Sequence, residues 1–483
     1  MYTAHIEQFY GIVQLVETRI GVSGMELCST RTVSDQLVFL NISWHHWGMN
    51  IAVIGLWHLG EIVSASFAEL GHCVIGIDEN KETIENLQKG IPPLDEPGLR
   101  ELLKKHLDVG TLSFTTDFSS VKNCEAVFMT FDTPVGENDE PELSVLFETA
   151  EKIAPHLNPT ALFAVVSQVP VGTTKELMDR MKQKNPGLTC DLAYFPENLQ
   201  LGKALDCFLK PDRVVVGADT DRARERLEVI IQKITAPRLT MNIASAEMSK
   251  HALNAFLATS LSFIYNISDL CEEAGADVTD VAAALRSDSR IGPSAYLDAS
   301  LGFSGGTLMR DLKTLVRFAK SRGRDVPVVE GVQKTNEERR KNIARHLENL
   351  LGVPLKRLKL GILGITYKPG TSTLRRSLGV ELMRILTDAG VAVGAYDPQA
   401  PEEEFSRMAS GTLARDPYQM AEDCRGVLLV TAWPEFKELD FKRLREKMAF
   451  PYLLFDTRNF FKERETEIRE AGLYYVGMGR PTL

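Results

Sequence analysis

The stretch of sequence that decides the fold is residues 51–78, IAVIGLWHLGEIVSASFAELGHCVIGID. An apolar run ends at Gly55, a turn leads through Gly60 into a helix-forming segment, and a second apolar run ends at Asp78. In a dinucleotide-binding βαβ unit the turn places the pyrophosphate on a helix N-terminus, and an acid about 20 residues later holds the ribose hydroxyls. This order therefore predicts a Rossmann-like unit.

One position of the turn differs from the dinucleotide-binding pattern. Trp57 stands where the middle glycine normally lets the phosphates approach the backbone, so we expect the indole to crowd them. A βαβ unit that keeps its fold and has lost tight NAD binding is the alternative interpretation. We predict NAD as the cofactor, contacted by Gly55, Leu59, Gly60 and Asp78.

The pattern of apolar runs alternating with amphipathic helical segments continues along the chain. Apolar runs lie at 51–54, 73–77, 125–131, 161–167, 192–195 and 213–217. Helical stretches follow at about 244–287 and 311–351, and a second series has apolar runs at 358–363, 391–396, 426–431 and 452–455, with a helix at 377–389. Continuous apolar runs of this kind predict parallel sheets that are covered on both faces.

The predicted fold class is therefore α/β, with two Rossmann-like doubly wound parallel-sheet domains joined by a helical central region. We expect the domains to span residues 49–238, 239–352 and 353–483. Residues 1–48 lack the features of a signal peptide, and Met49 stands just before the first apolar run. We expect them to be a poorly ordered N-terminal extension, with the functional start at Met49.

Composition excludes several classes of function. The 483 residues carry a formal net charge of −10, which argues against nucleic acid or an anionic membrane as the main partner. The seven cysteines are scattered without a CxxC pair, which predicts reduced thiols, a cytoplasmic location, and neither a metal site nor disulfides. The longest apolar stretch, 252–270, is interrupted by polar residues and predicts a buried helix instead of a membrane span.

A series of motifs makes the sequence specific enough to suggest a family. They are, in chain order, Pro93–Leu99 (PLDEPGL), Thr133-Pro134, Ser167–Thr174 (SQVPVGTT), Pro196–Gly202 (PENLQLG), Pro211–Gly217 (PDRVVVG), Ala246–Asn254 (AEMSKHALN), Arg290–Pro293 (RIGP), Gly302–Asp311 (GFSGGTLMRD) and Tyr367–Arg375 (YKPGTSTLR). Each is weak alone. The ordered set resembles the UDP-glucose/GDP-mannose dehydrogenase family over residues 49–477.

The resemblance implies a mechanism as well as a fold. Members of this family oxidise the C6 alcohol of a nucleotide sugar to a carboxylate with two NAD in succession. A cysteine captures the aldehyde as a thiohemiacetal, because an aldehyde has no second hydride to give until a nucleophile makes it tetrahedral. The implied partners are a UDP- or GDP-sugar and a second copy of the chain in a homodimer, without nucleic acid or membrane.

Residue by residue, the resemblance assigns most of a site. Lys250 and Asn254 lie four apart on one helix face and would stabilise the developing oxyanion, and Asp311 would pair with water or the nucleophile. Asp311 fits a helix N-cap equally well. The other implied contacts are Glu197 for catalysis, Thr133, Gln168, Arg310 and Arg375 for the cofactor, and Tyr296, Ser300, Gly305, Lys368 and, from the neighbouring subunit, Arg290 for the substrate.

Several positions depart from the family pattern where the chemistry is expected. Thr307 occupies the position of the nucleophilic cysteine, and a hydroxyl is a far poorer nucleophile than a thiol near neutral pH. Leu201 replaces the glutamate expected to organise the hydrolytic water, Gln168 replaces a threonine, Arg310 a lysine and Ser304 a glycine. Together these changes point to altered or lost four-electron oxidation.

Three functions remain open from the sequence. The first is an NAD-dependent nucleotide-sugar 6-dehydrogenase, either complete or limited to the alcohol-to-aldehyde step. The second is a catalytically impaired nucleotide-sugar-binding paralogue with a regulatory or partner role. The third is an oxidoreductase acting on another substrate, such as a hydroxyacid, which the second Rossmann-like domain with Lys368 and Arg375 disfavours.

The helix at 244–287 is apolar around most of its circumference, which predicts packing against a symmetry mate.

Overall fold

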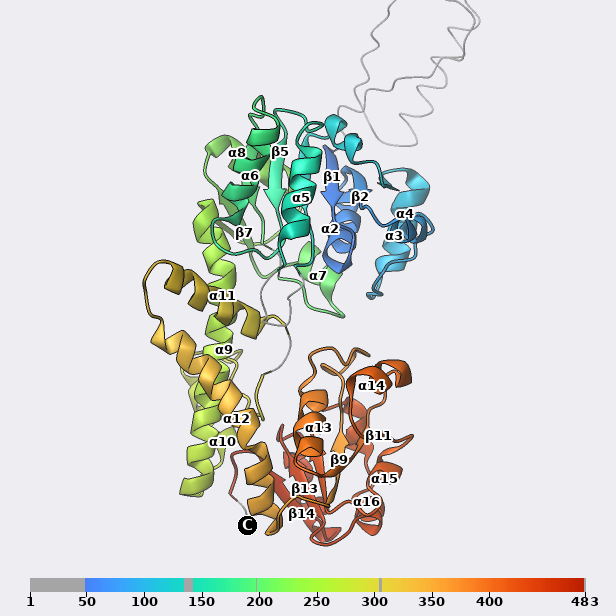
Figure 1. The fold of residues 1–483 in the computed structure, drawn as a ribbon, viewed down its shortest axis with the longest axis vertical. Helices are drawn as coiled ribbons and strands as arrows, with labels where there is room; N and C mark the ends of the chain where they lie inside the picture. The colour runs from blue at the N-terminus through green and yellow to red at the C-terminus, as the bar shows by residue number, and fades with distance from the viewer. Residues whose placement is uncertain (1–47, 134–141, 197, 304–305, 482–483) are drawn as a thin grey trace, which may run out of the picture. The chain divides into compact units, whose positions relative to one another are not determined.

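The computed structural model describes residues 48–133, 142–196, 198–303 and 306–481. The expected N-terminal extension falls almost entirely outside these described residues, so the prediction that it is poorly ordered stays untested. These described residues form one compact unit that contains two β-sheets (Figure 1). No helix of the described ranges is long and apolar enough to cross a membrane.

The first sheet has eight strands in the order β3-β2-β1-β4-β5-β6-β7-β8. Its strands are β1 (Asn50–Ile54), β2 (Cys73–Ile77), β3 (Leu112–Thr115), β4 (Ala126–Met129), β5 (Leu162–Val165), β6 (Asp191–Tyr194), β7 (Val214–Ala218) and β8 (Arg238–Met241). The six predicted apolar runs all form strands. The order reverses beside β1, which is where open α/β sheets bind ligands.

The expectation of a purely parallel first sheet is wrong at one pair of strands. β6 and β7 pair antiparallel, with Tyr194 opposite Gly217. The link between them carries α7 (Ala204–Leu209), which packs on α2 (His58–Glu69) instead of crossing the sheet, with the Phe208 and Phe67 rings 5.5 Å apart. The chain therefore enters β7 from the same end of the sheet at which it leaves β6, so β7 runs antiparallel to β6.

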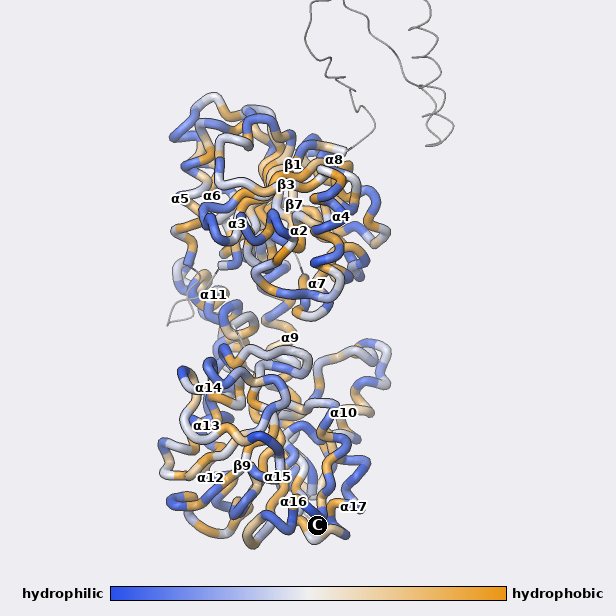
Figure 2. Tube along the Cα trace, turned by 90° about the vertical axis from the view of Figure 1, so that its right-hand side faces the viewer, coloured by the Kyte–Doolittle hydropathy of each residue, from blue (hydrophilic) through white to orange (hydrophobic). Residues whose placement is uncertain are grey.

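Helices cover both faces of the first sheet, as the continuous apolar strands require. Side chains of β1 alternate between two cores: Ile51 and Val53 face α2 and its neighbours, whereas Ala52 and Ile54 face the opposite layer. The first layer contains α2, α3 (Lys81–Leu87), α4 (Leu99–Val109), α7 and α8 (Asp221–Ile230), and the second contains η1 (Phe118–Asn123), α5 (Ser144–Ile153) and α6 (Thr173–Lys184). Figure 2 shows hydrophobic colouring concentrated on the central strands.

The central region consists of α9 (Ile243–Ala274), α10 (Val278–Ser287), α11 (Leu308–Ser321) and α12 (Pro327–Leu351). The predicted single helix over 244–287 is wrong, because α9 ends at Gly275, which adopts the left-handed conformation with φ +69°. The second predicted helical stretch, 311–351, contains α11 and α12. Asn242 caps α9 by accepting a hydrogen bond from the amide of Ser245.

The second sheet has six strands, all parallel, in the order β11-β10-β9-β12-β13-β14. They are β9 (Lys359–Leu363), β10 (Ala392–Tyr396), β11 (Thr412–Leu413), β12 (Gly426–Leu429), β13 (Leu453–Asp456) and β14 (Tyr474–Gly477). The elements between them are α13 (Leu378–Asp388), α14 (Glu402–Met408), α15 (Pro417–Met420), η2 (Pro434–Glu438), α16 (Phe441–Lys447), η3 (Lys462–Arg464) and α17 (Glu465–Glu470). The predicted fold class, two Rossmann-like domains with a helical centre, is confirmed.

Candidate active site

The predicted dinucleotide turn has the geometry of a phosphate-binding loop. Gly55 has φ +92°, a conformation that side chains rarely adopt, and a Cβ at Gly60 would lie 1.8 Å from the carbonyl oxygen of Gly55. The Asp78 carboxylate accepts the amide of Leu56 at 2.7 Å. Both glycines are therefore required by close packing, and Asp78 stands at the end of β2 where a ribose would be held.

Trp57 is the N-cap residue of α2 and has extended backbone with φ −89°, so the backbone at this position does not require glycine. Its indole is 54% exposed and makes no capping hydrogen bond. The amide of Leu59 is directed at the Asp132 carboxylate, 3.3 Å away. The positive end of α2 thus already faces one negative charge.

A second acid, Glu61, is completely buried in the first turn of α2. No side chain of the described residues donates a hydrogen bond to its carboxyl oxygens. Burial, together with the charges of Asp132, Glu96 and Asp95, raises the pKa of Glu61 to about 9, so the group is neutral at physiological pH. The turn, the helix N-terminus and Asp78 fit NAD, in acidic surroundings.

The predicted catalytic residues meet where α9 passes the first domain. Glu247 on α9 accepts the amides of Gly172 at 2.6 Å and Thr174 at 2.9 Å, which fixes the loop before α6 against the helix. One and two turns further along, Lys250 and Asn254 are almost completely buried, and the ammonium group of Lys250 donates to Asn198 Oδ1 at 3.3 Å.

Asp311 is the centre of this cluster and has no solvent exposure. Thr307 is the N-cap residue of α11 and Asp311 lies inside the helix, so the interpretation of Asp311 as an N-cap is wrong. The Asp311 carboxylate accepts from Gln168 Nε2 at 2.6 and 2.5 Å, from His251 Nδ1 at 2.9 Å, and from the amide of Asn254.

Two more predicted residues belong to the same cluster. The guanidinium group of Arg310 donates to the side-chain oxygen of Gln168, and its other amino group lies 3.3 Å from the carbonyl of Thr133. The hydroxyl of Thr133 donates to the backbone oxygen of Gln168 at 2.9 Å. The residues predicted to contact the cofactor, Thr133, Gln168 and Arg310, therefore contact one another, and Gln168 joins them to Asp311.

Thr307, at the expected nucleophile position, is exposed at the start of α11 and its hydroxyl makes no capping hydrogen bond. Leu201 is half-buried, and its carbonyl accepts from Lys368 Nζ at 2.8 Å. Glu197, Ser304 and Gly305 lie outside the described residues.

The remaining predicted substrate contacts are dispersed. Ser300 is fully buried and its hydroxyl accepts from Arg458 at 3.0 Å, whereas Tyr296 and Arg375 are exposed. Arg290 is also exposed and pairs with Asp288 of its own loop at 2.6 Å. The described contacts therefore hold Ser300 in the fold and leave Tyr296, Arg375 and Arg290 on the surface.

The second domain repeats the turn of the first. Gly364 has φ +80° after β9, and the Asp397 carboxylate after β10 accepts the amides of Ile365 and Thr366, each at 2.8 Å. The indole of Trp433 donates to the same oxygen at 3.0 Å. Asp397 was not among the predicted residues, although its place after the second apolar run of the C-terminal series matches that of Asp78.

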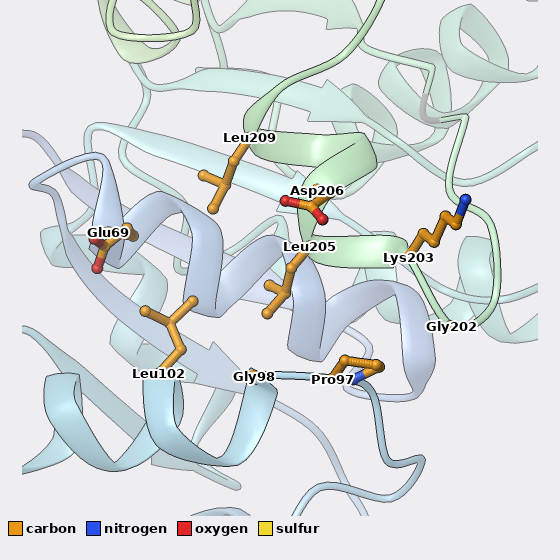
Figure 3. Close-up of a pocket in the computed structure, with 9 residues that line it drawn as sticks. All are labelled: Glu69, Pro97, Gly98, Leu102, Gly202, Lys203, Leu205, Asp206 and Leu209. Carbon is orange, nitrogen blue, oxygen red and sulfur yellow. The ribbon is translucent and has the colours of Figure 1, made fainter.

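A surface hollow of about 270 Å³ lies elsewhere on the first domain, between α2, α4 and α7 (Figure 3). Leu102, Leu205 and Leu209 line it together with Glu69, Lys203 and Asp206. None of the predicted site residues lines this hollow, so it is separate from the cluster around Asp311.

Sequence reasoning missed His251, Asp132 and Glu61. His251 could have been found, because it lies three residues before Asn254 and so shares its helix face. Asp132 immediately precedes the Thr133-Pro134 motif. Glu61 carries no sequence signal beyond a charged residue in an otherwise apolar helix.

Comparison with known proteins assigns the chain. Three sequence profiles of the UDP-glucose/GDP-mannose dehydrogenase family match: its NAD binding domain over residues 49–235, its central domain over 244–338 and its UDP binding domain over 361–463. The chain belongs to this family. Its first and third family domains contain the two turns described above.

Relatives match along nearly the whole chain. It is 34% identical over 440 residues to the UDP-glucose 6-dehydrogenase of Rhizobium meliloti, covering 90% of this chain and 100% of the relative. UDP-glucose 6-dehydrogenase TuaD of Bacillus subtilis is 34% identical, with 90% and 94% covered. The structure of a UDP-glucose dehydrogenase from Pyrobaculum islandicum superposes with a TM-score of 0.81 at 32% identity, covering 90% and 98%.

Proposed function

We propose that this chain is an NAD-dependent dehydrogenase that oxidises the C6 hydroxyl of a UDP-sugar to the aldehyde and stops there. The observation that carries the proposal is the buried cluster of Lys250, Asn254 and Asp311, with a threonine at the start of α11 where a thiol is expected. The NAD binding and UDP binding domains of the family support both ligands, and the named relatives support UDP-glucose as the first substrate to test.

The first oxidation needs groups that the site contains. Bound NAD would accept the hydride that leaves C6, and the hydroxyl proton would pass to the Asp311 carboxylate, directly or through a water molecule. Lys250 would offer positive charge to the C6 oxygen, and Asn254, one turn further along α9, donates its side-chain amide to Asp311. Gly55, Gly60 and Asp78 hold the cofactor turn in shape.

The second oxidation needs a nucleophile that the site lacks. The exposed Thr307 is the only candidate the pattern offers at the start of α11, and a hydroxyl needs a base to become nucleophilic. Burial raises the thiol pKa of Cys124 and Cys190 to about 11 and that of Cys424 to about 12, so these cysteines are poor substitutes.

The decisive experiment follows NADH and identifies the product by mass for a panel of UDP- and GDP-sugars. We expect slow formation of one NADH per sugar with a 6-aldehyde as the product. The combined variant Thr307→Cys with Leu201→Glu should move the product toward the uronic acid, whereas the control Thr307→Ser should not.

Two results would contradict the proposal. Uronic acid from the unmodified protein would mean that Thr307 or water serves as the nucleophile. No NADH from any sugar, even with the combined variant, would favour the alternative of a nucleotide-sugar-binding paralogue. That alternative has less support at present, because the matched relatives over 90% of the chain are dehydrogenases.

We also infer that the protein acts as a homodimer in the cytoplasm. Phe256, Phe263 and Leu270 follow one another at seven-residue intervals along α9 and are 70%, 49% and 63% exposed, which leaves an apolar stripe uncovered. The six cysteines of the described residues are free thiols, as in a reducing compartment.

The apolar stripe gives a direct test of assembly. Light scattering at micromolar concentration should report a dimer, and Phe256→Glu with Phe263→Glu should give a monomer, since two buried charges would face the partner. The control Val109→Glu changes an equally exposed apolar residue on α4 and should leave the dimer intact. A monomeric unmodified protein would contradict the inference and, with it, the delivery of Arg290 to a neighbouring site.

A further inference from the structure

The hydrogen bonds around Asp311 leave its carboxylate without a vacant acceptor position. Oδ1 accepts from Gln168 at 2.6 Å and from His251 at 2.9 Å, and Oδ2 accepts from Gln168 at 2.5 Å and from Asn254. A carboxylate offers about four lone-pair positions. All four are filled by protein donors in a side chain with no solvent exposure.

Gln168 is held in the orientation that makes this possible. Its side-chain oxygen accepts from the guanidinium group of Arg310, so its amide nitrogen must face Asp311. Arg310 is anchored in turn at the carbonyl of Thr133, 3.3 Å away, and the Thr133 hydroxyl returns to the backbone of Gln168 at 2.9 Å. Two of the departures from the family pattern, Gln168 and Arg310, therefore act as one unit.

His251 contacts Asp311 from the other side. Its Nε2 lies 2.8 Å from the carbonyl oxygen of Val169 and its Nδ1 lies 2.9 Å from Asp311 Oδ1. Both ring nitrogens are therefore engaged within the protein, which holds the ring against Asp311.

From these contacts we propose that Gln168, oriented by Arg310, is a positioning residue that occupies on Asp311 the place of a water molecule or substrate hydroxyl and thereby limits turnover. The inference rests on the proposed function. A carboxylate that must break a hydrogen bond before it can take a proton is a slow acceptor. Asn254, whose amide is turned onto Asp311, is drawn away from the substrate oxygen by the same arrangement.

The test compares two replacements of Gln168. Gln168→Thr restores the family residue, removes the amide and opens space for water, and should raise kcat for UDP-glucose at least about tenfold with KM within about twofold. Gln168→Met removes the amide but keeps the side-chain length, so it should not raise kcat. A role in stability alone would not separate these two variants. Gln88→Thr, which changes a glutamine bonded to Phe114 in the same domain, is the matched control.

The coupling of Gln168 to Arg310 can be measured without turnover. In chemical denaturation, Gln168→Thr, Arg310→Lys and the double variant should be non-additive, because each single change breaks the same hydrogen bond. Additive stability changes would overturn the network on which the inference depends.

The outcomes separate the two proposals. If the unmodified protein forms NADH and Gln168→Thr is no faster, the inference about Gln168 is wrong and the proposed function stands. If neither forms NADH with any sugar, both are wrong. If only Gln168→Thr forms NADH, the inference is supported in its strongest form.

Discussion

Both Rossmann-like domains place an aspartate directly after their second strand, and the two carboxylates have different surroundings. Asp78 is partly exposed and accepts two amides, those of Leu56 at 2.7 Å and Asn80 at 2.9 Å. Asp397 is buried, and one of its oxygens alone accepts two amides, a hydroxyl and the indole of Trp433. A carboxylate with spare lone pairs can serve a ligand, whereas a saturated one serves the fold.

The charges around the two turns differ as well. Beside the first turn are the acids Asp132 and Glu96, together with the neutral Glu61. The loop after Gly364 carries Lys368, Arg375 and Arg376, and the guanidinium group of Arg376 lies against Gly306. Phosphates bind at helix N-termini and beside cations. The charges around the second turn therefore favour a bound nucleotide. At the first turn it is mainly the backbone conformation that favours a bound nucleotide.

The largest expected effect separates the two aspartates. Asp397→Asn should lower the free energy of unfolding by about 3 kcal/mol. Both carboxylate oxygens of Asp397 accept hydrogen bonds, so in either orientation the new NH2 group of asparagine would face a hydrogen-bond donor. Asp78→Asn should cost about 1 kcal/mol and weaken NAD binding instead. Denaturant unfolding and calorimetry measure the two quantities, and equal stability losses would end the distinction between a ligand-facing and a structural carboxylate.

Glu61 should make the stability of the protein fall as pH rises. Its pKa is raised from 4.5 to about 9, so between these values the folded chain holds a proton that the unfolded chain has released. Glu61→Gln cannot ionise, so its stability relative to the unmodified protein should rise by about 3 kcal/mol between pH 5 and pH 7.5. A difference that does not change with pH would show that Glu61 is ionised in the fold.

Asp132 should weaken the cofactor site by occupying the amide of Leu59. Asp132→Asn removes this negative charge from the N-terminus of α2 and should tighten NAD about five- to tenfold at low salt, with a smaller gain at high salt. Asp95→Asn is the control, since that side chain is exposed and pairs with Arg100. Calorimetry without a sugar measures both, and equal gains would mean that only the overall charge of the region matters.

Trp57 should have the smallest effect. Because its indole is half-exposed and its backbone is extended, Trp57→Gly should relieve crowding at the pyrophosphate without reshaping the turn, and should tighten NAD about threefold. Trp57→Phe keeps a large ring and should change little. Equal or weaker NAD binding in the glycine variant would show that the indole does not approach the phosphates.

The sequence predicted the interior strands of both sheets and missed the four edge strands, β3, β8, β11 and β14. β8 was missed because its side chains are largely exposed, which leaves no apolar run to detect, and β11 has only two residues. The end of α9 at Gly275 was missed because one glycine in a helical pattern is ambiguous without its backbone conformation.

By itself the sequence determined the two Rossmann-like domains and the family, because continuous apolar runs and ordered motifs are local features of the chain. It could not show that Gln168 and Arg310 are partners, since 142 residues separate them. Only the packing of α11 against α9 and the loop before α6 brings them to Asp311. Hydrogen bonds in a buried site depend on which side chains exclude water together, and that is decided in three dimensions.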